Sequence, residues 1–547
     1  MKKPEDALPS HPPAPAISIL IPAAGQSRRM EGDDKLLRRI DGLAQIRRIA
    51  LAALATGYPV NVTLPEGDRD RRAALAGLDL TILDVADHAE GMAASLRRGA
   101  VAARGGAMMV VPADMPDLGG EDLARICRQH RAVPRAILRA TSRGQPGHPV
   151  LFPADLLAGI EALAGDAGAA SIIRRHADRL IGVPLPCTRA TLDLDTAGEW
   201  AAWEAGHGRP PVFQPGAAIV DDALSDLLHR DDAAVIAVIT GVDGPSFRDM
   251  GTLMCLFADG TSSGNLTNGC VEADLAHHAQ TVLRSGLPLQ LRYGRGSPFF
   301  DIRLPCGGGL DISLFPVRDR ASLVDAAHVL RGRAPIALAF HPDGAIRLVP
   351  AQATGWRGKV FVLARIPEPQ VMIFGDGAEA RTVARLFHAA GFAQLLVPGA
   401  AQTAGNHGAA GFQPGEVTAS DFAGPSGALL LADPWTAIIT LFHDHDREVD
   451  ILADALRGPA FHVGAQGSRR VADQRRARLR EAGLADAEID RLQAPVGLIP
   501  SARDPQSLAV SVLAGVVAAS RSTTVPAPAS EAMPTQEGPR GHPGDRT

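Results

Sequence analysis

Short apolar runs alternate with longer stretches rich in Ala, Leu and Arg over roughly the first third of the chain. The longer stretches carry apolar residues at helical spacing, whereas the runs have the length of buried strands: Ile17–Pro22, Val60–Leu64, Leu80–Leu83, Met108–Val111 and Ala136–Ala140. Alternation of strands with helices predicts a parallel sheet covered by helices. We therefore expect a Rossmann-like α/β first domain over residues 17–205.

The apolar pattern changes in the second part of the chain. Its strand-like runs predict an α+β middle domain over residues 225–364, and they are Ala234–Thr240, Thr252–Phe257, Phe299–Leu304, Leu310–Val317, Ile336–Phe340 and Lys359–Leu363. In the third part, a run at Gln370–Phe374 precedes a glycine turn, a helical pattern at Ala378–Ala390 and a run at Ala393–Val397. This βαβ order predicts a Rossmann-like third domain over residues 369–518, so the fold class is α/β.

Segments rich in proline and glycine separate these domains. Residues 206–224 include GHGRPPVFQP and are expected to be a linker, and a second break falls at Arg365–Pro369. Residues 1–16 and 519–547 are rich in Pro and polar residues, so we expect disordered tails. No apolar run approaches the length of a membrane span, and prolines stand where a signal peptide would be apolar. We therefore expect a cytoplasmic protein with no membrane partner.

The composition argues against several classes of function. The 547 residues carry a formal net charge of −5 and 4% aromatic residues, which offers neither a basic surface nor stacking platforms for nucleic acid. The five cysteines form no C-x-x-C pair, so we expect reduced thiols instead of a disulfide framework or a zinc site. Lysine occurs only at positions 2, 3, 35 and 359, so an internal lysine invites a chemical explanation.

A loop suited to phosphate follows the first predicted strand. The strand runs into AAGQSRRM, residues 23–30, and then into DKLL, residues 34–37. Arg29 and Lys35 are suited to neutralise the charge on a departing pyrophosphate and are the candidate catalytic cations. The alternative is a glycine turn before a solvated basic helix, but the scarcity of lysine favours phosphate chemistry. Small residues allow backbone N–H groups to surround a phosphate chain, and we assign nucleotide binding to Ala23, Ala24, Gly25 and Ser27.

A carboxylate follows another predicted strand. Asp114 comes after Met108–Val111, and side chains at the carboxyl ends of parallel strands gather at one edge of the sheet. Carboxylates at this edge suit Mg²⁺, which combines a few protein oxygens with substrate phosphates. Asp114 is therefore a candidate catalytic and metal-binding residue, and a turn acid before proline is the alternative.

These motifs together resemble the signature of MobA-like nucleotidyltransferases. Four further motifs of that family follow in order over residues 15–205: Gly91–Leu96, Val110–Pro116, Gly147–Phe152 and Asp193–Thr196. The resemblance implies nucleotide contacts from Gly91 and Ser95 and a second Mg²⁺ ligand at Asp193, whereas Asp195 is equally compatible with a position at a helix N-terminus. It also implies pterin contacts from His148, for which packing in a Gly-Pro turn is the alternative.

Two departures from the guanylyl branch of that family resemble the molybdopterin cytidylyltransferases. Ala24 stands where the guanylyl branch carries a second glycine, and Gly91-Met92 stands in place of a Gly-Pro pair. The resemblance therefore implies CTP as the nucleotide, Mg²⁺ as the metal, and the molybdenum cofactor (molybdopterin) as substrate or bound product.

Two cysteines of the middle domain lie beside glycines. Cys270 is part of GNLTNGCVE, residues 264–272, and Cys306 is part of LPCGGG, residues 304–309. A thiol next to glycine backbone can reach a soft metal or a sulfur atom, whereas most free cysteines are small buried hydrophobes. These motifs resemble the XdhC/CoxI family, maturation factors for molybdenum hydroxylases. The resemblance implies that Cys270 and Cys306 contact the cofactor.

The third domain continues this resemblance with Thr440–His445, Gly464–Arg470 and Ala494–Leu498. Its Gly375-Asp376-Gly377 turn suits a pyrophosphate, yet no acid occurs from Ala380 through Gly415 to bind the ribose of NAD. We therefore expect Gly375 and Gly377 to receive a pterin dinucleotide, and an empty scaffold is the alternative. The candidate contacts in this groove are His443, Asp444, Ser468 and Arg469.

Two such families in one chain imply a single pathway. The first domain is expected to transfer CMP from CTP to molybdopterin. The other domains are expected to hold the cofactor, support its sulfuration and deliver it to a molybdenum hydroxylase of the xanthine or CO dehydrogenase type. A cysteine desulfurase and a second copy of the chain are further candidate partners. The alternatives are a cofactor-binding chaperone with an inactive transferase domain and an NAD(P)-dependent oxidoreductase.

Overall fold

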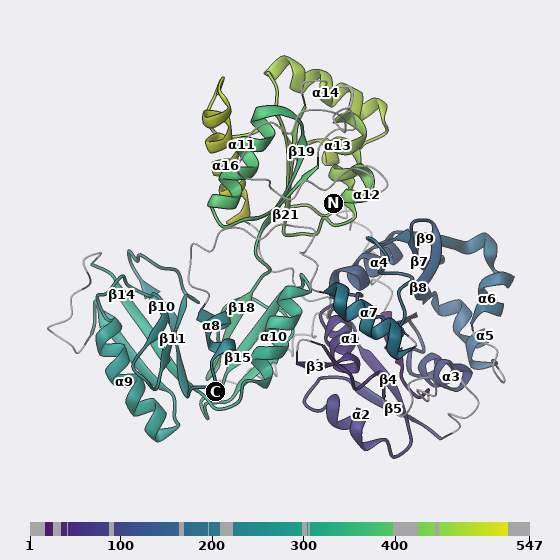
Figure 1. Cartoon of the computed structure of the whole chain (residues 1–547), viewed down its shortest axis with the longest axis horizontal. Helices are drawn as coiled ribbons and strands as arrows, with labels where there is room; N and C mark the ends of the chain where they lie inside the picture. Colours follow the sequence, from purple (N-terminus) through teal and green to yellow (C-terminus); the bar gives the residue numbers. More distant parts are fainter. Residues whose placement is uncertain are drawn as a thin grey trace, which may run out of the picture.

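The computed structural model contains three domains, each with sheets of its own (Figure 1). It describes residues 17–25, 34–40, 42–86, 92–163, 169–194, 196–207, 223–297, 304, 307–397, 425–442 and 448–522. The expected tail at 1–16 and most of the expected linker and C-terminal tail lie outside these residues. In Figure 1 the third domain lies above the junction between the other two. No described helix is long and apolar enough to cross a bilayer.

The first domain is built on a seven-stranded sheet with the order β5-β4-β1-β6-β8-β7-β9. Alternate residues of β1 face opposite layers, because Ile19 packs with the core of helices α1 and α4 whereas Leu20 packs with that of α3. The strands are β1 (Ile17–Pro22), β4 (Val60–Pro65), β5 (Thr81–Val85), β6 (Ala107–Val110), β7 (Ile137–Ser142), β8 (Gln145–Phe152) and β9 (Leu180–Pro184). The helices are α1 (Gln45–Leu54), α2 (Arg69–Ala74), α3 (Met92–Ala102), α4 (Gly120–Ala132), α5 (Leu157–Glu161), α6 (Ala170–Arg175) and α7 (Ala197–His207).

The expectation of a parallel sheet is wrong at one side of this domain. β1 pairs parallel with β4 and β6, but β8 runs antiparallel to both β6 and β7. β7 and β8 are joined by Arg143 and Gly144, whose φ angles of +51° and +78° suit a two-residue hairpin turn. The segment Gly147–Phe152, which resembles a substrate loop in sequence, is therefore part of strand β8.

The middle domain contains two antiparallel sheets, as the α+β expectation requires. The larger sheet has the order β12-β11-β10-β14-β13 and packs against helix α9, whereas the smaller has the order β16-β15-β18-β17 and packs against α10. The expected strand Phe299–Leu304 lies almost entirely outside the described residues. The elements are α8 (Ala223–His229), β10 (Ala234–Asp243), β11 (Leu253–Phe257), β12 (Ser262–Gly264), α9 (Glu272–Ser285), β13 (Leu289–Gly294), β14 (Gly309–Val317), α10 (Ala321–Arg331), β15 (Ile336–Phe340), β16 (Ile346–Val349), β17 (Gly355–Arg357) and β18 (Val360–Arg365).

The third domain has the doubly wound architecture expected from its βαβ start. Its parallel sheet has the order β20-β19-β21-β22-β23, with α11 and α16 in the core on one face and α12 and α13 in the core on the other. Helix α16 continues to Ser520, so residues 519 and 520, which we expected in the C-terminal tail, are helical. The elements are β19 (Gln370–Gly375), α11 (Gly377–Ala389), β20 (Ala393–Val397), α12 (Pro425–Leu429), β21 (Thr436–Leu441), α13 (Glu448–Arg457), β22 (His462–Ala465), α14 (Arg469–Glu481), α15 (Asp486–Ile489), β23 (Leu492–Gln493) and α16 (Pro505–Ser520).

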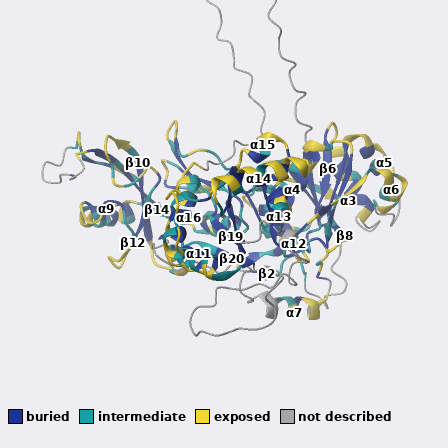
Figure 2. Cartoon of the chain, turned by 90° about the horizontal axis from the view of Figure 1, so that it is seen from above, coloured by how far each residue is buried: buried dark blue, intermediate teal, exposed yellow. Residues whose placement is uncertain are grey.

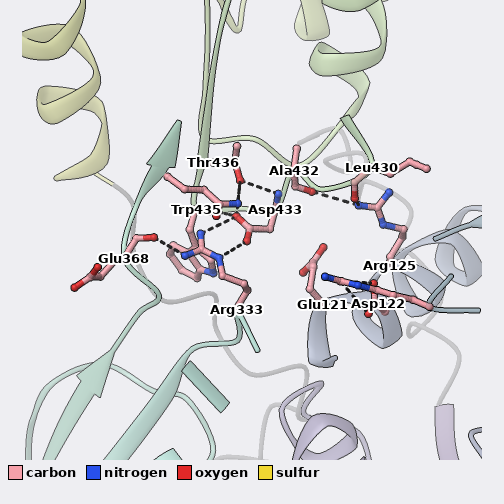
Figure 3. A network of polar contacts seen from close by, with 12 residues as sticks. Glu121, Asp122, Arg125, Arg333, Glu368, Leu430, Ala432, Asp433, Trp435 and Thr436 are labelled. Atoms are coloured by element: carbon pink, nitrogen blue, oxygen red, sulfur yellow. Dashed lines mark hydrogen bonds and ion pairs between the residues drawn. The ribbon is translucent and has the colours of Figure 1, made fainter. Parts of the chain in front are cut away.

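Arginine side chains connect the domains (Figure 3). Arg333 of the middle domain donates to both carboxylate oxygens of Asp433 in the third domain, at 2.7 and 3.2 Å, and to the Glu368 carbonyl at 2.6 Å. Arg125 of the first domain donates to the Leu430 carbonyl at 2.6 Å. A cavity of about 840 Å³ lies at this junction, and no described residue that we expect to carry chemistry lines it. Across each domain the strands are largely buried and the outer helix faces exposed (Figure 2).

Candidate functional site

The loop after β1 begins the candidate nucleotide site. Ala23 and Ala24 are buried, and Gly25 is exposed. The Ala23 N–H donates to the carbonyl and the hydroxyl of Thr63 on β4, at 3.1 and 3.3 Å. That N–H is engaged within the sheet, so the expectation that Ala23 offers it to a phosphate does not fit this structure. Ala24 packs with Ala94 of α3, so its small side chain allows the helix to approach the loop.

Lys35 and Asp114 meet at the carboxyl edge of this sheet, where the sequence predicts Asp114. The Lys35 Nζ lies 2.6 Å from Asp114 Oδ2, and both side chains are largely shielded from solvent. Asp114 follows strand β6, and the buried Gln45 side chain of α1 donates to the carbonyl of Ala113 just before it at 3.0 Å. A lysine and an aspartate 79 positions apart are thus held in one ion pair.

Asp193 and His148 are brought to the same place by backbone contacts. The Leu194 N–H donates to the Asp114 carbonyl at 3.3 Å, and the His148 N–H donates to the Ala190 carbonyl at 2.7 Å. Gly147 has no room for a side chain, because a Cβ there would lie 1.8 Å from the Ala190 oxygen. The segment between Ala190 and Leu194 therefore runs between β8 and the end of β6.

The His148 ring lies in the field of both acids. Burial lowers the pKa of His148 and Arg139 lowers it further, whereas Asp114 and Asp193 oppose part of the shift. The Nδ1 atom is buried and has no hydrogen-bond partner among the described residues. The ring is therefore neutral at pH 7 and retains a polar atom that a bound heterocycle can satisfy.

Asp114 and Asp193 provide the donors that Mg²⁺ prefers. Both are carboxylates at the edge where a triphosphate would bind, and Mg²⁺ takes its remaining ligands from water and phosphate oxygens. Among the described residues no group of three or more His, Cys, Asp or Glu side chains is arranged for a metal. The chemistry of the two carboxylates is therefore compatible with Mg²⁺.

Most of the other residues expected at this site are not described by the structure. Ser27, Arg29 and Gly91 fall outside the described residues. From Met92 onward the expected second nucleotide loop is helical, because these residues form the first turns of α3, and Ser95 is only 3% exposed there.

Helix α7 begins with a pair of reciprocal hydrogen bonds. The Glu199 N–H donates to the Thr196 hydroxyl at 3.2 Å, and the Thr196 N–H donates to the Glu199 carboxylate at 2.9 Å. Thr196 therefore caps this helix. Asp195, which the sequence also allows at this helix N-terminus, lies outside the described residues.

A single carboxylate organises the Cys270 loop in the middle domain. Glu272 accepts backbone N–H bonds from Leu266, Thr267, Gly269 and Val271 at 2.7–3.2 Å, and a bond from the Thr267 hydroxyl at 2.7 Å. Burial raises the pKa of Glu272, but these hydrogen bonds outweigh it and hold the pKa below its ordinary value. Cys270 is exposed on this turn, next to the buried Val271. The sequence places Glu272 in the motif, but nothing in it indicates this role.

The glycine motifs of the middle domain gather at one end of its larger sheet. Asp243 at the end of β10 pairs with Gly309 at the start of β14, and Gly309 pairs with Gly294 at the end of β13. A Cβ on Gly308 would lie 2.0 Å from the Pro245 carbonyl, so a side chain is excluded there. β12 runs in the same direction as β10, so the loop with Cys270 leaves the sheet at this end. Cys306 lies outside the described residues.

The third domain also gathers its motifs at the carboxyl edge of its sheet. A Cβ on Gly375 would lie 2.5 Å from the Leu441 carbonyl, and Gly377 has a φ of +87° where helix α11 begins. After β22, the Ser468 hydroxyl accepts the Val471 N–H at 3.3 Å and caps α14, and Arg469 is exposed beside it. Ser468 therefore has a structural role that its motif does not reveal. His443 and Asp444 lie outside the described residues.

A buried ion pair braces this edge. Glu448, fully buried at the start of α13, accepts from Arg475 Nε of α14 at 2.9 Å, and Arg475 is 3% exposed. Arg475 also donates to the Gln466 carbonyl at 2.9 Å, and Glu448 accepts the Phe442 N–H at 3.3 Å. The pair thus ties the ends of β21 and β22 to the two helices that follow them. Neither Glu448 nor Arg475 is a candidate from the sequence alone.

Comparison with known proteins matches each part of the chain to a family. The MobA-like NTP transferase domain matches residues 19–180, the XdhC and CoxI family matches 227–294, and the XdhC Rossmann domain matches 371–516. The molybdenum cofactor insertion chaperone PaoD of Escherichia coli is 34% identical over 293 residues, which span 53% of this chain and 85% of that protein.

Two solved structures match parts of the chain. One, described as a xanthine dehydrogenase from Bacillus halodurans, is 23% identical with a TM-score of 0.43, and the match covers 55% of this chain and 95% of that one. The other, a nucleotidyl transferase from Methanothermobacter thermautotroptrophicus, is 22% identical with a TM-score of 0.31, and covers 36% and 99%. From the family matches and the PaoD relationship, the chain belongs to the XdhC and CoxI family and carries a MobA-like NTP transferase domain in the same polypeptide.

Proposed function

We propose that the first domain transfers CMP from CTP to molybdopterin and that the other two domains hold the product and deliver it to a molybdenum hydroxylase. The observation that carries the transferase proposal is the meeting of Lys35, Asp114, Asp193 and His148 at one sheet edge. The PaoD relative is named a molybdenum cofactor insertion chaperone, which supports the delivery proposal. An inactive transferase domain remains the competing hypothesis.

The proposed reaction is an in-line displacement at phosphorus. A terminal phosphate oxygen of molybdopterin bonds to the α-phosphorus of CTP, and the bond to the bridging oxygen breaks to release pyrophosphate. Asp114 and Asp193 would hold Mg²⁺, which supplies charge neutralisation at the phosphates. The Lys35 ammonium, which contacts Asp114 in this structure, supplies a second positive charge near the departing pyrophosphate. An ionised phosphate needs no general base, so no proton transfer is assigned to His148. We assign its ring to orienting the pterin instead.

Delivery is assigned to the middle and third domains. Cys270 is exposed on a loop that Glu272 holds, which suits contact with the molybdenum centre or with the sulfur added to it. The carboxyl edge of the third sheet near Gly375 and Gly377 is assigned to the pyrophosphate of the pterin dinucleotide. A molybdenum hydroxylase apoenzyme is the proposed recipient. We further propose that a cysteine desulfurase docks on the chain and that two copies form a dimer.

The direct test is to mix the full chain with Mg²⁺ and molybdenum-loaded molybdopterin, to add CTP and GTP in competition, and to measure pyrophosphate and the dinucleotide formed. We expect preferential use of CTP, because Ala24 and the Gly91-Met92 pair resemble the corresponding residues of the molybdopterin cytidylyltransferases. Preferential formation of the guanine dinucleotide would assign the chain to the guanylyl branch. No dinucleotide from either nucleotide would leave the chaperone hypothesis in its place.

The groove of the third domain is tested by titration calorimetry with NAD⁺, NADP⁺ and the pterin dinucleotide. We expect heat of binding with the pterin dinucleotide alone, because no acid stands at the usual ribose-binding position between Ala380 and Gly415. Arg469→Ala is expected to weaken that binding, since the guanidinium is exposed at the N-terminus of α14. Tight NAD⁺ binding with no response to the pterin dinucleotide would contradict the assignment and revive the oxidoreductase alternative.

The two middle-domain thiols are tested by replacing each with serine. We expect Cys270→Ser and Cys306→Ser to weaken capture of the molybdenum cofactor, because a hydroxyl is a poor ligand for a soft centre. Cys187→Ser is the matched control, since Cys187 is an exposed thiol in the first domain. The measurement is the molybdenum that remains bound after gel filtration, together with activation of a client hydroxylase. Retention at the control level by both variants would make the thiols structural.

A further inference from the structure

Arg71 is an almost fully buried arginine on a short helix next to the candidate nucleotide site. Helix α2 begins at its N-cap Asp68, whose carboxylate accepts the Arg71 N–H at 3.0 Å and fixes the backbone from which the side chain extends. Arg71 is 5% exposed, although its neighbour Arg72 is solvent-accessible. A buried guanidinium needs several acceptors, so its partners indicate what it does.

Apart from Asp68 of its own helix, whose Oδ2 lies 3.5 Å from Nε, the partners of Arg71 come from both sides of a single stretch of sequence. Nη1 donates to the carbonyls of Ala23 and Gly25 at 2.6 and 3.0 Å. Nε and Nη2 donate to the two carboxylate oxygens of Asp34 at 2.6 and 3.0 Å. One cation therefore joins the loop after β1 to the turn that carries Lys35.

The first set of contacts fixes the direction of a peptide group. In a planar trans peptide the C=O and the N–H point in opposite directions. Because the Ala23 carbonyl points at Arg71, the N–H of Ala24 points away from it. Backbone N–H groups presented in this way are what binds a phosphate chain. Arg71 thus occupies the carbonyl side of the loop and leaves the N–H side to an anion.

The second set of contacts fixes the Lys35 turn. Asp34 Oδ1 accepts the Leu36 N–H at 3.0 Å, and the Asp34 carbonyl accepts the Leu37 N–H at 2.9 Å. Lys35 lies within this turn and reaches Asp114. Displacement of Asp34 would therefore displace the ammonium that we assign to the pyrophosphate.

We propose that Arg71 is a positioning residue for the nucleotide: it holds the loop after β1 and the Lys35 turn in the arrangement that receives the triphosphate of CTP. The inference rests on the proposed transferase function. Arg71 itself does not touch the substrate, because Nε, Nη1 and Nη2 are all bound to protein oxygens.

The test compares Arg71→Ala with Arg72→Ala in the full chain. Arg72 is the matched control because it is the next residue of the same helix and pairs with Asp84 at the surface. We expect Arg71→Ala to raise the KM for CTP about tenfold or more, since small displacements of binding groups are costly, with a smaller change in kcat. Arg72→Ala should leave the KM within about twofold of wild type, as expected for an exposed ion pair. Added guanidine should lower the KM of Arg71→Ala and leave that of Arg72→Ala unchanged.

A second variant covers the case in which Arg71→Ala does not fold. Arg71→Lys keeps the charge, but one ammonium cannot serve the loop carbonyls and both Asp34 oxygens together, so the raised KM should persist. A KM for Arg71→Lys equal to that of Arg72→Ala would overturn the inference. If the wild-type chain releases no pyrophosphate, the proposed function fails. The inference is then judged on CTP affinity by calorimetry, and equal affinities for the Arg71→Lys and Arg72→Ala proteins would overturn it.

Discussion

Replacement of Asp114 by asparagine is expected to lower the rate of pyrophosphate release about a hundredfold or more. Asparagine has nearly the same shape as aspartate but lacks the charge that would hold Mg²⁺ and that attracts Lys35 across 2.6 Å. The Asp193 carboxylate would then face the metal alone. The measurement is pyrophosphate release from CTP at saturating molybdopterin and Mg²⁺.

The same substitution should leave the fold nearly unchanged. The Lys35–Asp114 pair is largely shielded, with side-chain exposures of 15% and 23%, so its loss is expected to cost about 1–3 kcal/mol, which leaves the domain folded. Asp117→Asn is the matched control, because Asp117 lies on the same loop and accepts the Trp203 Nε1–H at 3.0 Å, which an asparagine oxygen can also do. Near wild-type turnover by Asp114→Asn would overturn the assignment of this edge as the transferase site.

Local patterns in the sequence were sufficient to identify most strands of the fold. Apolar runs such as Ile17–Pro22 and Gln370–Phe374 become central strands, because apolar segments of this kind can be buried on both faces. Strand β8 was missed because its first half, Gln145–Pro149, contains a glycine and two prolines and reads as a loop. Its pairing depends on the Arg143-Gly144 turn and on the edge that β6 offers, which no local pattern shows.

The sequence indicated which residue types could do chemistry but not which partners hold them. Asp114 was predictable, because it follows a parallel strand and such strands end at one edge, and Lys35 was singled out by the scarcity of lysine and by the small-residue loop that precedes it. Arg71 was not, because one arginine among many carries no signal until Asp34, 37 positions away, is placed beside it. Glu272 was visible in its motif, but five hydrogen bonds to one carboxylate depend on how the loop turns. Long-range polar pairing is therefore what the structure adds.

Replacement of Glu448 by alanine is expected to destabilise the third domain by about 3–5 kcal/mol, the usual cost of removing one partner of a buried ion pair. Arg475 would be left as a charge that is 3% exposed, and the loop after β21 would lose the acceptor of its Phe442 N–H bond. The measurement is the urea concentration that unfolds this domain, monitored by hydrogen exchange in β21 and β22.

Two further variants separate the loss of the pair from the loss of packing. Asp473→Ala removes an exposed partner of Arg476 on the same helix α14 and should cost less than about 1 kcal/mol. The double variant Glu448→Met with Arg475→Met removes both charges and should recover much of the lost stability, because apolar residues can replace a buried pair. If Glu448→Ala unfolds at the same urea concentration as Asp473→Ala, the pair does not brace the carboxyl edge of the sheet. Pterin dinucleotide affinity near Gly375 should then be unchanged in Glu448→Ala, whereas a functioning brace predicts that it weakens.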